Sequence, residues 1–166
     1  MNAWTIGSGT LALIFAGVST YYQMSGQTAK ATAPHYSIVT PGEAESVGLC
    51  VPVIRGRGEA PQKGSLWLVV HGLANVGYYP VRQVQTRQGE EEWSVSKVQV
   101  GSAETEAGQR YELVLWQIDE DLTEAIEHIP VKHRVFNDPP ASASVVGQPT
   151  TVVRRADTRS CGASGN

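Results

Sequence analysis

Charged side chains are scarce in this chain of 166 residues, and neither sign predominates. The 13 Lys and Arg residues stand against 16 Asp and Glu residues, which gives a formal net charge of −3. A nucleic-acid-binding domain normally carries a clear basic excess, because it must neutralise phosphates. The composition therefore excludes nucleic acid as the expected partner.

Cysteine is also rare, with Cys50 and Cys161 as the two in the sequence. Two cysteines are too few for a disulfide scaffold, and their spacing does not fit a zinc site. A bond between them requires an oxidising compartment. Cys50 falls in a predicted strand and Cys161 in a polar tail, so a reduced pair and a disulfide both stay open.

Recognisable catalytic motifs are missing as well. The sequence has no Gly-x-Ser-x-Gly elbow, and no Gly-rich loop is followed by Lys-Ser or Lys-Thr. His71 ends an apolar run, where a half-buried structural histidine is the ordinary role. Glu124 and His128 are four residues apart, which suits metal binding, but the pattern is not His-Glu-x-x-His. We therefore expect no enzymatic activity, no cofactor and no metal site.

The first side chain with a charge is Lys30. In the uncharged segment before it, Trp4 and Tyr21 are 17 positions apart, which corresponds to about 26 Å in an α-helix. That length is close to the hydrocarbon thickness of a bilayer, and aromatic rings such as those of Trp4, Tyr21 and Tyr22 favour its two interfaces. We predict a transmembrane helix over residues 1–24 that contacts the lipid bilayer.

The alternative for this segment is a cleaved signal peptide. The small residues at 29–33 fit a cleavage site, although the N-terminus lacks the usual basic residues. For a single-pass protein of the cell membrane, Lys30 is the nearest basic residue. The positive-inside bias then favours the cytoplasmic side for the domain that follows.

Short runs of β-branched and aromatic residues, separated by turns, follow a flexible linker at residues 25–34. The 17 Gly and 9 Pro residues disfavour a bundle of long helices. We therefore predict an all-β fold, an antiparallel β-sandwich of about seven strands over residues 35–156. The candidate strands are 35–40, 47–54, 65–71, 78–86, 93–100, 110–118 and 144–155.

One short helix is predicted at residues 119–128, which have acids in the first turn and apolar side chains at helical spacing. Pro130 ends this helix. We expect Asp121 and Glu124 to form a pair like a capping box. The polar tail at 157–166 is predicted to be disordered.

Apolar alternation predicts where several strands lie. Residues 66–70 are apolar on both faces, which favours a central strand, and residues 110–118 carry two alternating apolar faces. Pro52 lacks a backbone donor, so its strand belongs at a sheet edge or is broken there. The apolar positions before and after residues 96–97 have opposite parity, which predicts a β-bulge near that point.

Aromatic residues are the candidate contacts for a ligand or partner. Tyr78 and Tyr79, with Trp67 and Trp93, have the chemistry of a platform on which a sugar or peptide can stack. Sandwich cores use the same residue types, and we expect Trp67, Trp93, Leu113 and Trp116 to be largely buried. Tyr78 and Tyr79 are therefore the first candidates for contact.

Five short motifs lie between residues 45 and 156: 66–70, Tyr78-Tyr79-Pro80, 93–101, Gly108-x-x-Tyr111-Glu-Leu113 and 152–155. Together they resemble a β-sandwich module of uncharacterised bacterial proteins, often actinobacterial and often beside membrane-spanning segments. Val81 differs from the Gln that often follows Tyr-Tyr-Pro in that pattern. The resemblance implies a non-enzymatic accessory or sensing module and supplies no catalytic residues.

These observations together predict a membrane-anchored module that binds or senses a ligand or a protein partner, as an accessory or effector subunit. The alternative is a structural subunit of a membrane assembly, in which the chain associates with copies of itself. A ligand-binding module works as a monomer, whereas a structural subunit needs its neighbours.

Overall fold

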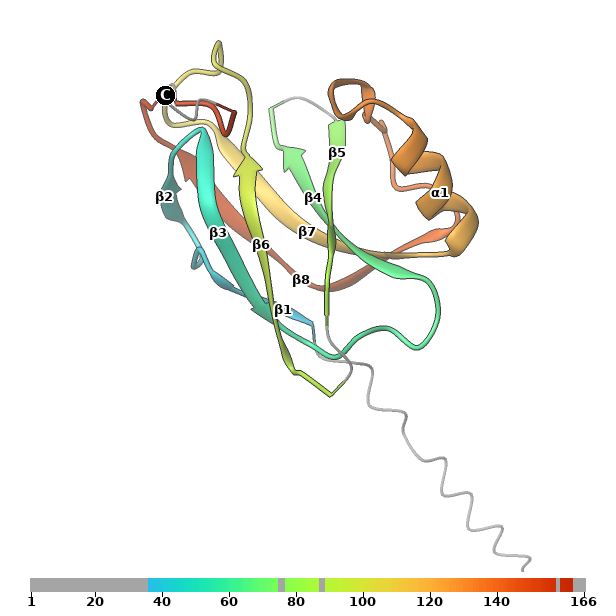
Figure 1. Ribbon diagram of the computed structural model, residues 1–166. Helices are drawn as coiled ribbons and strands as arrows, with labels where there is room; N and C mark the ends of the chain where they lie inside the picture. The colour runs from blue at the N-terminus through green and yellow to red at the C-terminus, as the bar shows by residue number, and fades with distance from the viewer. Residues whose placement is uncertain (1–35, 75–76, 87–88, 158, 163–166) are drawn as a thin grey trace, which may run out of the picture. The chain divides into compact units, whose positions relative to one another are not determined.

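The computed structural model describes residues 36–74, 77–86, 89–157 and 159–162 (Figure 1). Strands dominate this part of the chain, which confirms the all-β prediction. The elements are β1 (Ser37–Thr40), β2 (Glu45–Val47), β3 (Cys50–Arg57), β4 (Ser65–Gly72), β5 (Gly77–Val84), β6 (Glu92–Gln99), β7 (Arg110–Ile118), α1 (Glu120–His128), the 3-10 helix η1 (Val131–His133) and β8 (Ala143–Arg154).

The predicted transmembrane helix over residues 1–24, with Trp4, Tyr21 and Tyr22, lies outside the described residues. Within the part of the chain that is described, no helix has the length and apolar character needed to cross a membrane.

The strands form two facing sheets (Figure 1). The smaller sheet has the order β1-β3-β6, and the larger one has the order β2-β8-β7-β4-β5. All the pairings are antiparallel except that of β2 with β8. The sequence-based strands included residues 47–54 as one element, but the chain changes sheets at Gly48 and Leu49. Strand β2 therefore pairs in the larger sheet and β3 in the smaller one.

Two separate cores lie on the two faces of β4. Leu66, Leu68 and Val70 pack between the sheets, whereas Trp67 and Val69 pack on the outer face of the larger sheet. The predicted central position of this strand is confirmed, since β4 lies between β5 and β7. A strand that is buried on both faces needs a cover on the outside as well as a second sheet on the inside.

Strand β7 repeats this pattern with the predicted alternation. Leu113 and Leu115 belong to the inner core, and Trp116 and Ile118 belong to the outer core. The four residues expected to be buried are all core residues, with exposed fractions of 0% to 3%; they are Trp67, Trp93, Leu113 and Trp116.

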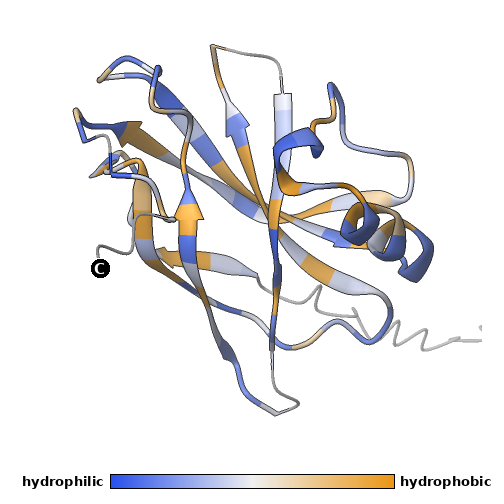
Figure 2. Ribbon diagram, turned by 45° about the horizontal axis from the view of Figure 1, so that its top comes forward, coloured by the Kyte–Doolittle hydropathy of each residue, from blue (hydrophilic) through white to orange (hydrophobic). Residues whose placement is uncertain are grey.

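Helix α1 covers the outer core by burying Ile126 against it. Figure 2 shows that α1 carries both hydrophilic and hydrophobic residues, as expected of a helix with one buried side. The prediction of a cap from Asp121 and Glu124 is wrong, because Asp119 is the N-cap and its carboxylate accepts a hydrogen bond from Leu122 N at 2.8 Å. The helix ends at His128, with Ile129 as its C-cap directly before Pro130.

In β6 the buried side chains change from odd to even positions, as predicted, but no β-bulge is present at that point. Val95 and Val98 are both buried although they are three residues apart. The register with β3 does not shift, so no extra residue is inserted. Instead Lys97 adopts a φ of 56°, at the position that the register sets opposite Pro52. Both strands change the face that they bury at this point, since Val51 and Ile54 in β3 are also buried three residues apart.

Of the tail predicted to be disordered, residues 157 and 159–162 are described, and these residues contact the domain. Arg154 is 2% exposed, and its guanidinium donates hydrogen bonds to the backbone carbonyls of Arg155 and Asp157. The backbone N–H of Arg159 donates to Asp157 Oδ1 at 3.0 Å, and this bond holds the pKa of the Asp157 carboxyl below its ordinary value. A disulfide joins Cys161 to Cys50 at the start of β3.

Replacing Gly56 with Ala is expected to destabilise the domain. A Cβ atom at Gly56 would lie 1.9 Å from Cζ2 of Trp93, its cross-strand partner in β6. Overpacking of this kind costs about 1–3 kcal/mol, which a denaturant titration of the chain measures. Gly162→Ala is the control, because nothing lies within 4 Å of its added methyl group. Equal midpoints for the two variants would contradict the close packing around Gly56.

Removing the disulfide with Cys50→Ser and Cys161→Ser is also expected to lower stability. The bond closes a loop with a sequence separation of 111 residues, and in the chain-entropy model a loop of about 100 residues contributes about 4.7 kcal/mol. Chemical denaturation measures the loss, with Ser160→Ala as the control. Iodoacetamide labelling of the chain isolated without reductant gives an independent test. Labelling of both cysteines before reduction would contradict the bond.

Candidate functional site

The sandwich is open on the side where β5 and β6 face each other. Each of these strands has one hydrogen-bonded neighbour, so β5 is an edge of the larger sheet and β6 is an edge of the smaller one. A cavity of about 500 Å³ opens between them and reaches the inner core. Its apolar walls come from β4, β5, β7 and η1, with the residues Val70, Tyr79, Pro80, Val81, Tyr111 and Val131.

The polar side of the cavity is built by the loop between β6 and β7. The hydroxyl of Thr105 accepts hydrogen bonds from Ser102 N at 3.0 Å and from the Tyr111 hydroxyl at 3.2 Å. Gln99 Nε2 donates to the carbonyl of Gly101 at 3.1 Å. Because these groups satisfy one another, an apolar ligand can enter beside them without leaving a buried donor unpaired.

Two glycines give the tyrosine rings their positions at the mouth. Gly101 has a φ of 83°, and a Cβ there would lie 2.5 Å from the Tyr111 hydroxyl. Gly77 lies under the ring of Tyr79, with the position of its missing Cβ 3.0–3.1 Å from atoms of that ring. Tyr79 is half-buried and packs against the inner core. It is therefore held in the wall of the cavity.

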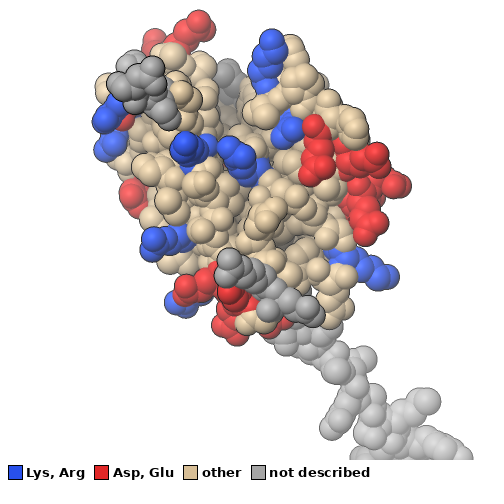
Figure 3. Space-filling model, viewed as in Figure 1, with Lys and Arg blue, Asp and Glu red and all other residues tan. Residues whose placement is uncertain are grey.

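A second cavity of about 640 Å³ adjoins the first and shares Val81, Gln99 and Val131 with it. Its charged lining comprises three cations and one carboxylate, namely Arg82, Lys97, Arg134 and Glu127. In the first cavity the charged lining residue is Lys132. Figure 3 shows acidic side chains gathered over α1, while basic ones lie towards the middle of the same face.

Arg134 differs from the other cations because its guanidinium is already engaged. Its Nε donates to the carbonyl of Ile129 at 2.7 Å, and its Cζ lies 5.8 Å from the centre of the Trp67 ring. Arg82, Lys97 and Lys132 form no ion pair within the described part of the chain. These three cations are therefore available to an anion.

Both strand edges at the opening are poorly suited to pair with another strand. Pro80 has no backbone donor, and Tyr78 already exchanges two backbone hydrogen bonds with Phe136, at 2.8 and 3.0 Å. On the other side the left-handed backbone of Lys97 interrupts the regular edge of β6. Bulges, prolines and lysines at edges prevent sheet extension. A ligand is therefore expected to be recognised by side chains rather than by strand addition.

The four aromatic residues predicted as contacts lie in different places. Trp67 and Trp93 belong to the outer and inner cores and are 2% and 3% exposed, so the four rings do not form one exposed platform. Tyr79 lines the cavity, whereas Tyr78 lies on the outer face. There Tyr78 stacks on His71, with ring centres 4.0 Å apart.

His71 has a structural arrangement on this outer face. Its Nδ1 lies 3.0 Å from Oε2 of Glu112, its cross-strand partner in β7. The ring of Tyr78 covers one side of the imidazole and also contacts Trp116, with centres 5.5 Å apart. The carboxylate and the stacked ring together fix the orientation of His71.

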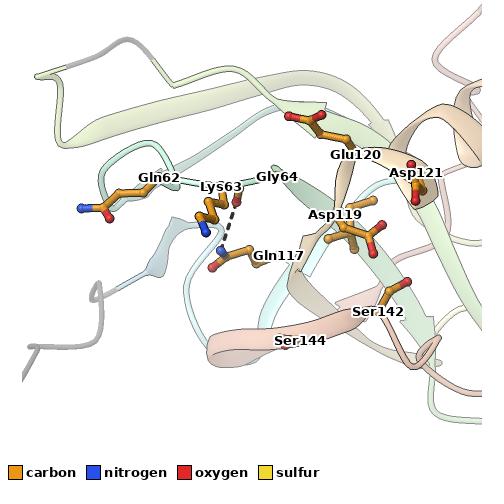
Figure 4. A pocket seen from close by; sticks show the side chains of 10 residues that line it. Gln62, Lys63, Gly64, Gln117, Asp119, Glu120, Asp121, Ser142 and Ser144 are labelled. Atoms are coloured by element: carbon orange, nitrogen blue, oxygen red, sulfur yellow. Dashed lines mark hydrogen bonds between the residues drawn. The ribbon is translucent and has the colours of Figure 1, made fainter.

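A third pocket, of about 810 Å³, lies where α1 begins and is polar (Figure 4). Gln117 Nε2 donates there to the carbonyl of Lys63 at 3.2 Å, and the carboxylates of Asp119 and Glu120 point in different directions. Nδ1 of His128 is hydrogen-bonded to the backbone oxygen of Glu124 at 2.8 Å. In the described ranges no cluster of three or more His, Cys, Asp or Glu side chains is arranged to hold a metal ion.

Comparison of the chain with protein family models, with curated proteins and with solved structures finds no match.

Tyr79 was predicted as a contact from the sequence, whereas the other residues that complete its cavity were not. Tyr111 fell within the predicted strand 110–118 and was not singled out as a contact. Thr105 lies in the loop between β6 and β7 and Lys132 lies in η1, and no motif marks either residue. Gly101 and Gly108 at the ends of a polar loop were the available signals, because they mark a tight connection between β6 and β7.

Alanine substitutions at the two neighbouring tyrosines are expected to lower stability by different amounts. Tyr78→Ala removes the ring contacts with His71 and Trp116, and aromatic pairs contribute about 0.5–1.5 kcal/mol each beyond buried area. We therefore expect Tyr78→Ala to lower the free energy of unfolding by about 1 kcal/mol more than Tyr79→Ala. Equal losses in a denaturant titration would contradict the division of the two rings between a structural and a ligand-binding role.

Proposed function

We propose that this domain is a non-enzymatic ligand-binding module whose site is the cavity between the edges of β5 and β6. The observation that supports this function is a cavity of about 500 Å³ that leads from the surface into the inner core. Its volume lies within the range of about 300–1,000 Å³ that is usual for small-molecule sites. An apolar wall with a few polar groups at one side is also typical of such sites.

The proposed setting is the surface of a cell membrane, with residues 1–24 as the anchor and the domain on the oxidising side. The disulfide between Cys50 and Cys161 supports this side, because such bonds persist outside the reducing cytosol. It outweighs the single nearby charge of Lys30, which favours the opposite orientation. The resemblance to membrane-associated sensing modules supports the same general role.

Labelling with an uncharged photoreactive amphiphile tests the binding site. The full chain is placed in phosphatidylcholine nanodiscs and irradiated with dodecanol that carries a diazirine group near the end of its chain. Peptide mass spectrometry then locates the label. We expect saturable labelling of residues 79–81 and 99–105, because these segments form the walls of the cavity.

Val131→Trp is the variant that should block this site. Val131 is 62% exposed and lines both cavities, so a larger ring can fill the opening without disturbing either core. We expect labelling of the cavity to fall at least about tenfold, which corresponds to about 1.4 kcal/mol. The matched control is Val145→Trp on β8, which is exposed and lines none of the three cavities described above. Unchanged labelling in Val131→Trp would rule out the cavity as the binding site.

A further inference from the structure

We infer that the ligand of this site is a single-chain amphiphile with an anionic head, such as a long-chain carboxylate or alkyl phosphate. The inference rests on the proposed function and assigns the two adjoining cavities to the two parts of one molecule. The hydrocarbon chain occupies the apolar cavity that contains Tyr79 and Tyr111. The head occupies the neighbouring cavity that contains Arg82 and Lys97.

The chemical difference between the two cavities supports this division. The first one is walled by Val70, Val81 and tyrosine rings, and the hydroxyls of Ser102 and Tyr111 are hydrogen-bonded to that of Thr105. Burying a hydrocarbon chain there is favourable, whereas a polar group would find few free partners. The second cavity carries Arg82 and Lys97, which have no carboxylate partner in the described part of the chain.

The two cavities adjoin, so one molecule can place its chain in the first and its head in the second. Val81, Gln99 and Val131 line both cavities and mark where they meet. Lys132 follows Val131 directly and adds a cation at the opening of the apolar cavity. The two adjoining cavities together thus have an excess of positive charge, in a chain whose net charge is −3. This local excess complements an anionic head and opposes a cationic one.

The strand edges argue against a peptide as the occupant. A bound extended peptide obtains its affinity from main-chain hydrogen bonds to a sheet edge. At this opening Pro80 offers no donor, Tyr78 is paired with Phe136, and the backbone of Lys97 is left-handed. A hydrocarbon chain needs no such hydrogen bonds. The apolar cavity and the cations therefore suit an amphiphile better than a strand.

Three photoreactive probes with the same dodecyl chain and diazirine test the charge of the head. They are a carboxylate, an alcohol and a trimethylammonium, each used with the full chain in phosphatidylcholine nanodiscs. We expect the carboxylate to reach half-maximal labelling of residues 79–81 and 99–105 at about tenfold lower concentration than the alcohol. The trimethylammonium probe should label these segments least. Equal half-saturation for the three heads would overturn the inference while leaving the cavity as a binding site.

Removal of the two cations separates a specific head site from partition of the probes into lipid. Arg82→Gln together with Lys97→Gln should raise the half-saturating concentration of the carboxylate about tenfold, which corresponds to about 1.4 kcal/mol. The same variant should leave labelling by the alcohol unchanged. Lys63→Gln with Arg110→Gln is the control, since this double variant also removes two positive charges but neither residue lines either of the two adjoining cavities. An equal effect of the two double variants would overturn the assignment of the head to Arg82 and Lys97. Failure of all three probes to label the cavity would overturn both this inference and the proposed function.

Discussion

Burial of β4 and β7 on both faces is the constraint on which the rest of the domain depends. Their inner faces pack against the smaller sheet, and their outer faces leave Trp67, Val69 and Trp116 in need of a cover. Helix α1 supplies that cover by burying Ile126. The chain must then return to the sheet from the helix, and it does so through η1 and Phe136, which bridges to Tyr78 on the edge of β5. The return path places Val131 and Lys132 beside the opening of the sandwich. The candidate site is thus bounded by a segment whose position follows from the outer core.

Local patterns in the sequence were sufficient for elements whose burial follows from their own residues. The range 110–118 was predicted as a strand with two apolar faces, and β7 has these bounds. Its apolar residues alternate between the two cores, with Leu113 and Leu115 on the inner face and Val114 and Trp116 on the outer face. The prediction failed where a partner distant in sequence decides the structure. Residues 45–47 form a strand because they pair in parallel with β8, and nothing within the three residues indicates that pairing. The cap from Asp121 and Glu124 failed for a local reason, because the helix begins one residue after Asp119 and that carboxylate reaches Leu122 N first.

Polar composition does not reveal the contacts of the tail residues that the structure describes, 157 and 159–162. Residues 157–166 are small and polar, and such composition alone favours disorder. Yet Arg154 binds the carbonyls of Arg155 and Asp157, and the backbone N–H of Arg155 donates to the carbonyl of Val47 at 2.9 Å. These bonds carry the chain past Gly48, where a Cβ would lie 2.9 Å from Oδ2 of Asp157. Cys161 thereby arrives beside Cys50. A cysteine count cannot reveal these contacts of Arg154 and Gly48.

An open edge in a β-sandwich carries a risk, because two unpaired strand edges can capture a further strand from another chain. Pairing of β5 with β6 would remove both edges, but these two strands are not hydrogen-bonded neighbours. Each edge is instead made unsuitable for pairing. Pro80 removes a donor, Phe136 occupies Tyr78, and Lys97 breaks the regular backbone opposite Pro52. Each of these features blocks extended backbone while leaving the space between the sheets accessible. A fold that needed only a stable core would gain more by filling this space with side chains. Protection of the edges without closure of the cavity is the combination expected of a site that admits a small amphipathic molecule and excludes a strand.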